Sequence, residues 1–115
     1  MRTPLVAGNW KMNGTRASVA ELTAGITAGA GDIAGVDVLV CPPFVYIPDV
    51  AAALEGSSVQ LGGQDLYAEA AGAYTGEISG PMLQDCGCRY VIIGHSERRA
   101  LLGETDAIIA RGFRI

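Results

Sequence analysis

The sequence predicts an α/β protein in which parallel strands alternate with helices packed outside them. Apolar, β-rich segments begin at residues 5, 36, 59 and 90, and helical patterns lie between them. This spacing fits a strand followed by a crossover helix, the unit from which parallel sheets are built. Half of the 115 residues are hydrophobic, which is enough for one small domain with a core. The expected strands are Leu5–Trp10, Val36–Cys41, Val59–Gly63 and Tyr90–Gly94.

Capping, proline and glycine signals place helices between these strands. Ser18-Val-Ala-Glu21 matches a capping box at the start of the first helix. Val19, Leu22 and Ile26 then fall on one face of that helix. Prolines in the first turn and glycines at the end indicate two more helices. One runs from Pro48 to Gly56, and the other begins at Pro81, after an N-cap at Ser79, and ends at Gly87. A last helix begins at Glu104.

Four strand–helix units do not close a cylinder, because a βα barrel needs eight units and roughly 250 residues. We therefore expect residues 1–115 to be the amino-terminal portion of a single barrel domain, a half-barrel reaching the start of its fourth helix. Nothing in the sequence terminates a fold at Ile115, so we expect a fifth strand to be missing. The stretch from Gln64 to Gly80 has no periodicity, and loops of that length are usually functional or interfacial.

Composition excludes several classes of function. A net charge of −4 provides no basic surface for nucleic acid, and no apolar run approaches the roughly 18 residues of a membrane span. The amino terminus turns polar too early for a signal peptide. Three cysteines, two of them separated by one glycine, suit a reducing cytoplasm, and we expect them to be small buried residues. Cys86 and Cys88 with His95 lack a fourth ligand and the usual zinc spacing, so no metal is expected.

Polar side chains follow three of the expected strands, at the rim where parallel βα folds place their active sites: Asn9 and Lys11, Gln64 and Asp65, and His95 and Glu97. A lysine, an asparagine amide and an imidazole are three hydrogen-bond donors. Donors that converge on one point stabilise a developing oxyanion, such as the oxygen of an enediolate.

His95 is the only histidine, and it has two interpretations. It could simply satisfy a turn, which is the more common role of a lone histidine. It also precedes Ser96, an N-cap residue, and a helix N-terminus disfavours the imidazolium form. A neutral imidazole there could exchange a proton at pH 7 without carrying charge. Its neighbours on the rim favour the functional interpretation.

Three separated motifs resemble the triosephosphate isomerase family. Val6-Ala-Gly-Asn-Trp-Lys-Met-Asn13 looks like its first strand and loop, Ala73-Tyr-Thr-Gly-Glu-Ile-Ser79 like its third loop, and Tyr90 to Arg99 like its fourth strand and histidine loop. The resemblance implies a TIM (β/α)8 barrel, no cofactor, and interconversion of dihydroxyacetone phosphate and glyceraldehyde 3-phosphate in glycolysis and gluconeogenesis. A neutral helix-terminus histidine is an established property of this family, so that interpretation of His95 is not independent of the resemblance.

The resemblance also implies roles for individual residues. Lys11 would bind and steady the substrate, Asn9 would donate to its enediolate oxygen, and His95 would be the electrophile. Glu97 would hold Lys11 through an ion pair. The Asp65–Ser79 loop would form a homodimer by inserting Thr75 into the neighbouring subunit, and the residues supporting that contact would be Gln64, Glu77 and Arg98.

The family's catalytic carboxylate and its phosphate-binding groups lie on the sixth to eighth loops, which this sequence does not contain. Glu97 is the nearest candidate base, but the resemblance commits it to Lys11. We therefore expect the 115 residues alone to be inactive, and to be oligomeric, aggregating or partly ordered, unless a carboxyl-terminal half completes the site. The alternatives are a non-catalytic half-barrel that assembles with itself or another chain, and a different βα-barrel phosphate enzyme. The glycine spacings match neither a P-loop nor a dinucleotide fold.

Overall fold

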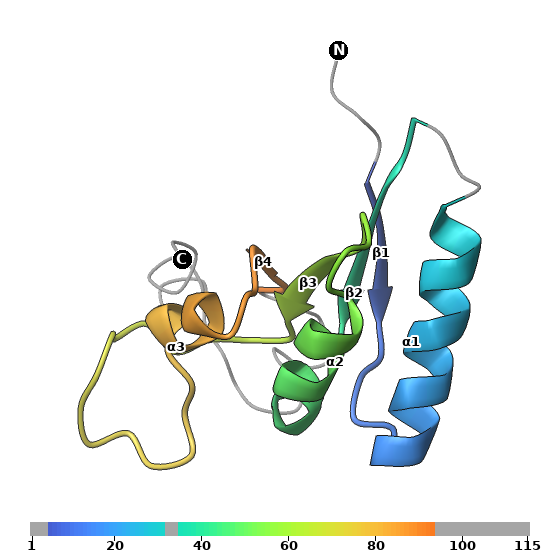
Figure 1. Cartoon of the computed structure of the whole chain (residues 1–115). Helices are drawn as coiled ribbons and strands as arrows, with labels where there is room; N and C mark the ends of the chain where they lie inside the picture. Colours follow the sequence, from blue (N-terminus) through green and yellow to red (C-terminus); the bar gives the residue numbers. More distant parts are fainter. Residues whose placement is uncertain (1–4, 32–34, 94–115) are drawn as a thin grey trace.

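The structure, a computed structural model, describes residues 5–31 and 35–93 (Figure 1). Four parallel strands lie side by side in the order in which they occur in the chain. They confirm the expected α/β half-barrel. Within the described residues, each strand is one or two residues shorter than the sequence predicted. The strands are β1 (Leu5–Asn9), β2 (Asp37–Cys41), β3 (Gln60–Gly63) and β4 (Tyr90–Val91).

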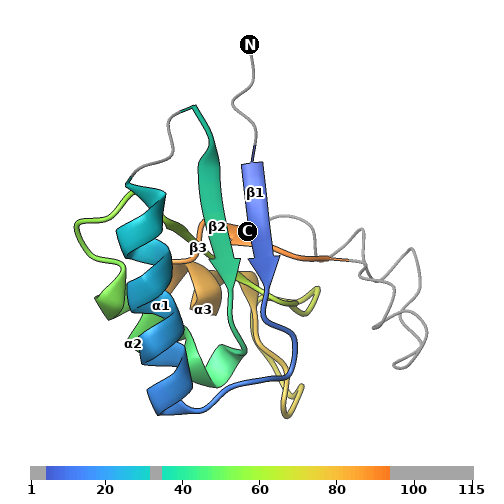
Figure 2. The ribbon, with the colours of Figure 1, turned by 90° about the vertical axis from the view of Figure 1, so that its right-hand side faces the viewer.

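The connecting helices all lie on one face of this sheet, as Figure 2 shows from the side. This is the arrangement of a βα barrel, in which helices surround the strands and the other sheet face forms the interior. The expected helix opening at Glu104 lies outside the described residues. Among residues 5–31 and 35–93, no helix is long and apolar enough to cross a membrane. The helices are α1 (Arg16–Ala30), α2 (Ile47–Ala53) and α3 (Gly80–Asp85), with a 3₁₀ turn at Phe44–Tyr46.

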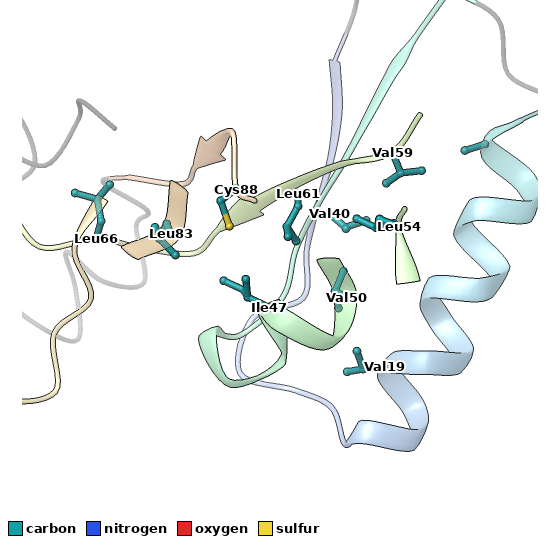
Figure 3. Packing of buried hydrophobic residues seen from close by; sticks show 11 residues of the cluster. Val19, Val40, Ile47, Val50, Leu54, Val59, Leu61, Leu66, Leu83 and Cys88 are labelled. Atoms are coloured by element: carbon teal, nitrogen blue, oxygen red, sulfur yellow. The ribbon is translucent and has the colours of Figure 1, made fainter. Parts of the chain in front are cut away.

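The hydrophobic core fills the space between the sheet and the helices (Figure 3). Val50 on α2 and Leu83 on α3 are 1% and 2% exposed, and they belong to the same buried cluster as Val40 and Leu61 of the central strands. Burial of this apolar surface is the main driving force that holds the helices on the strands. The remaining buried members of the core are Val19, Ala30, Ile47, Leu54, Val59, Leu66 and Cys88.

The sheet face that points away from the helices is closely packed around Gly62. Side chains alternate along a strand, so Leu39 and Cys41 point away from the helix side on which Val40 lies. At Gly62 of β3, an added Cβ would lie 2.9 Å from Cys41 Sγ and 3.0 Å from the carbonyl oxygen of Tyr90. A side chain at position 62 would therefore push against backbone, which explains the glycine there.

Helix α1 begins one turn earlier than the sequence predicted. Thr15 is the N-cap: its side chain accepts from the backbone N–H of Ser18, and the Ser18 hydroxyl accepts from the N–H of Thr15. Ser18 is therefore the third helical residue and not the cap, and the predicted box with Glu21 was wrong. Gly14, at φ +122, turns the chain before Thr15 in a conformation that L side chains rarely adopt.

The other two helices follow their predicted signals. Pro48 lies in the first turn of α2, and Gly56 follows that helix with φ +79. Ser79 caps α3 by accepting from the N–H of Met82, and Gly87 ends the turn after it with φ +96. Both glycines adopt the left-handed conformation that terminates helices.

Strand β1 is an open edge of the described sheet. Leu5 and Val6 are 45% and 58% exposed, although apolar strand residues normally contact neighbours on both faces of a parallel sheet. A groove of about 380 Å³ lies between the loop after β1 and α1. Its walls are Trp10, Asn13, Gly14, Ser18, Val19 and Leu22.

Candidate active site

The carboxyl ends of β1, β2 and β3 meet at one rim. Asn9 ends β1 and lies in register beside Cys41, the last residue of β2. Lys11 follows two residues after Asn9, and Gln64 follows directly after β3. The structure thus brings together three of the rim residues that the sequence predicted. Asp65, the fourth, is buried with only 7% of its surface exposed, whereas Lys11 is exposed.

Lys11 has a strained backbone. Its φ of +55 makes it the only residue other than glycine with a positive φ among those the structure describes. The left-handed conformation brings Cβ too close to the following carbonyl oxygen and costs roughly 1–2 kcal/mol for an L-residue. Strain of this kind persists only when surrounding contacts determine it, and it concentrates at functional sites.

Asn9 holds the amide side of Lys11. The Asn9 Oδ1 atom accepts a hydrogen bond of 2.9 Å from the backbone N–H of Lys11. Because the amide oxygen is engaged in this way, the other hydrogen-bonding end of the Asn9 side chain is its Nδ2 donor. The local turn therefore fixes which end of the amide is offered to a ligand.

Gln64 holds the carbonyl side of Lys11. Its Nε2 group donates to the carbonyl oxygen of Lys11 at 2.7 Å and to that of Cys41 at 2.9 Å. The Cys41 carbonyl also accepts from the backbone N–H of Trp10 at 3.2 Å. One side-chain amide thus links the ends of all three strands at the rim.

The predicted interface loop projects away from the sheet and returns to it (yellow in Figure 1). Tyr67 donates its backbone N–H to Ile78 at 2.8 Å, and its ring lies 4.5 Å from that of Tyr74, centroid to centroid. Thr75 and Glu77 lie beyond this pair and are exposed. The loop therefore presents these two residues on a preformed scaffold.

His95, Glu97 and Arg98, the remaining predicted site and interface residues, lie outside the described residues. Sequence reasoning also missed one contact at the rim. The Tyr46 hydroxyl donates to the carbonyl of Gly14 at 2.9 Å and so ties the loop after β2 to the loop after β1. An aromatic residue after two prolines carries no signal for such a partner 32 positions away.

The cysteines are only partly as predicted. Cys41 and Cys88 are buried, but Cys86 is exposed, because it lies on the turn between α3 and β4. Burial raises the pKa of the Cys41 thiol to about 12, and the nearby Cys88 adds to the effect. Burial, with a contribution from Cys86, raises the pKa of Cys88 to about 11. No group of three or more His, Cys, Asp or Glu side chains in residues 5–31 and 35–93 is placed to hold a metal ion.

These thiols predict a clear order of alkylation. At pH 8, iodoacetamide should modify Cys86 in the native chain and leave Cys41 and Cys88 unmodified until denaturant is added, because only an accessible thiolate reacts. The raised pKa values mean that folding favours the protonated thiols. This stabilisation is complete below the ordinary thiol pKa of about 8.5 and is lost as pH rises towards 11–12. Peptide mass spectrometry measures the order, and native labelling of Cys41 as fast as Cys86 would contradict it.

Comparison with known proteins identifies the family. The family model described as triosephosphate isomerase matches residues 4–115. The triosephosphate isomerases of Chloroflexus aurantiacus and Afipia carboxidovorans are 53% and 59% identical to this chain over 114 and 107 residues. These alignments cover 99% and 92% of the chain but 46% and 42% of the relatives, so the chain spans under half of their length.

A solved structure agrees with this assignment. The crystal structure of triosephosphate isomerase from Bartonella henselae superimposes with a TM-score of 0.90 at 42% identity. The superposition covers 96% of this chain and 46% of that one. The parallel half-barrel therefore has the TIM-barrel fold, and the chain belongs to the triosephosphate isomerase family.

Proposed function

We propose that this chain is the amino-terminal portion, residues 1–115, of a single-domain triosephosphate isomerase, which interconverts dihydroxyacetone phosphate and glyceraldehyde 3-phosphate in the cytoplasm. The chain supplies the electrophilic half of the site, Asn9, Lys11 and His95. The observation that carries the proposal is the fixed, left-handed backbone of Lys11 at the strand rim, between Asn9 and Gln64. Strain held in this way at a rim of polar donors is typical of a catalytic centre.

The proposed chemistry is proton transfer through an enediolate. When a carbon-bound proton leaves, negative charge develops on the carbonyl oxygen of the substrate. The Lys11 ammonium and the Nδ2 donor of Asn9 stabilise that charge, and they do so without reorganising because their backbone is already fixed. His95 polarises the carbonyl and moves protons between the adjacent oxygens, and Glu97 holds the Lys11 side chain.

We also propose that the site works in a homodimer. The internal contacts of the Asp65–Ser79 loop support this, because a projecting loop that keeps its own shape loses little entropy on docking. Thr75 at its exposed end would enter the partner subunit beside Asn9, Lys11 and His95. Gln64, Glu77 and Arg98 would support the contact.

Complementation tests the proposal. The carboxylate that removes the carbon-bound proton is assigned to the part of the relatives that this chain does not cover, and proton abstraction needs a base within direct reach. The 115-residue chain alone should therefore give no turnover above buffer. Adding a separately purified carboxyl-terminal half of a close relative should produce isomerase activity in a coupled assay.

The controls separate the alternatives. The carboxyl-terminal half alone should be inactive, and so should the mixture when the chain carries His95→Ala. Robust turnover by the chain alone, abolished by Glu97→Gln, would overturn the assignment of the base. The open β1 edge favours the second candidate, a non-catalytic assembly module, and a stable homo-oligomer that ignores the added half would support it in place of the enzyme.

A further inference from the structure

We propose that Gln64 is a positioning residue which holds the backbone of Lys11 in its left-handed conformation from within the same subunit. The resemblance to the family suggests only that Gln64 supports the dimer contact. The geometry gives it a further task, because its Nε2 group donates two hydrogen bonds to carbonyl oxygens of its own chain. The conformational claim rests on these bonds, and its consequence for catalysis rests on the proposed function.

The chemistry of position 64 is specific. The two partners, the carbonyls of Lys11 and Cys41, are both acceptors, so the group between them must offer two donors from one atom. A neutral amide nitrogen does so, whereas a carboxylate of the same shape offers only acceptors and would repel both oxygens. Asparagine is one methylene shorter, and the bonds of 2.7 and 2.9 Å leave no slack for that loss.

The arrangement restrains Lys11 from both sides. Asn9 accepts a hydrogen bond from the Lys11 N–H, and Gln64 donates one to the Lys11 carbonyl oxygen. Because the peptide groups on both sides of its Cα are held, Lys11 has little freedom to relax φ. Gln64 is itself anchored, because it follows β3 directly and also bonds to the end of β2. We call these hydrogen bonds of Asn9 and Gln64 to the Lys11 backbone the clamp. The clamp connects exposed Lys11 to the ends of three paired strands and so limits its motion.

Hydrogen–deuterium exchange of the 115-residue chain, followed by mass spectrometry, tests the clamp. Gln64→Met keeps the shape and removes both donors, and it should speed exchange in the segment from Trp10 to Asn13 roughly tenfold or more. Gln60→Met, at the first residue of β3, is the matched control and should leave that segment unchanged. Equal exchange in the two variants would overturn the proposal, and so would a uniform rise over the whole chain.

Two further variants distinguish positioning from general stability. In a Lys11→Gly background, glycine adopts a positive φ without strain, so no strain is released when the two hydrogen bonds are lost, and Gln64→Met should lower the denaturation midpoint more than it does in the parent chain. An equal loss in both backgrounds would contradict the proposal.

Gln64→Glu should regain protection of the Trp10–Asn13 segment on acidification. Two facing carbonyls disfavour its charged form, so its pKa should be raised, and below the ordinary pKa of about 4.3 its single O–H can donate to one of the two carbonyls, which restores part of the protection. That gain should disappear as pH rises, and exchange that is independent of pH after correction for the intrinsic rate would count against the clamp. None of these readouts needs turnover, so failed complementation would overturn the proposed function and leave this inference standing.

Discussion

Replacing Lys11 with methionine should lower kcat/KM of the completed isomerase by about 10²- to 10³-fold, the cost of losing one preorganised stabiliser of an oxyanion. Methionine has a similar length but no charge, so the change removes the ammonium group from the developing enediolate. Because the interaction strengthens as charge develops, most of the loss should appear in kcat. Steady-state kinetics on the complemented mixture measures the effect.

Arg16→Met is the matched control for this prediction. It removes the same charge from the same part of the chain, but the Arg16 side chain is 84% exposed and pairs with an exposed carboxylate, that of Asp49, at 3.3 Å. Exposed ion pairs contribute about 0–1 kcal/mol, so kinetics and folding should change little. If Arg16→Met and Lys11→Met reduced turnover equally, the role of Lys11 would be long-range electrostatics and not a place in the site.

Truncating Leu83 to alanine should destabilise the chain by about 2–5 kcal/mol, a large fraction of the stability of a small domain. Leu83 is 2% exposed, and it packs so closely over β3 that a Cβ added at Gly63 would lie 2.8 Å from its Cδ1 atom. Alanine would leave a cavity between α3 and the strand, since glycine has no side chain with which to fill it. The midpoint of urea unfolding measures the loss, for the chain alone or in its assembled form.

Met82 provides the comparison on the same helix. It is 53% exposed, so Met82→Ala removes a side chain of similar size without opening a buried cavity and should change stability by less than about 0.5 kcal/mol. Equal midpoints for the Leu83→Ala and Met82→Ala chains would show that α3 is not packed on the sheet as described.

Much of the fold could be predicted because its signals are local. The apolar runs of β2 and β3, the proline of α2 and the serine cap of α3 each lie within a few residues of the element that they specify. Helix α1 shows where local signals compete. Two hydroxyl residues, Thr15 and Ser18, stand three positions apart, and the tertiary turn at Gly14 selects the first as the cap.

The site was predicted by residue type but not by geometry. Asn9, Lys11 and Gln64 were placed at the rim because each follows an apolar strand. Nothing in a lysine indicates a positive φ, because that conformation is imposed by partners elsewhere. The decisive one, the amide of Gln64, is 53 residues away from Lys11, and such a contact exists only once the strands are aligned. Cys86 was placed wrongly inside for a related reason, since composition does not distinguish a buried thiol from one on a turn.

The groove beside β1 also has a spectroscopic consequence. Trp10, the only tryptophan in the sequence, forms part of its wall together with Val19 and Leu22. Indole emission shifts to shorter wavelength when water is excluded. A partner that covers this groove should therefore shift the emission maximum of the intrinsic fluorescence. The chain therefore carries its own optical reporter in the loop after β1, one residue before Lys11.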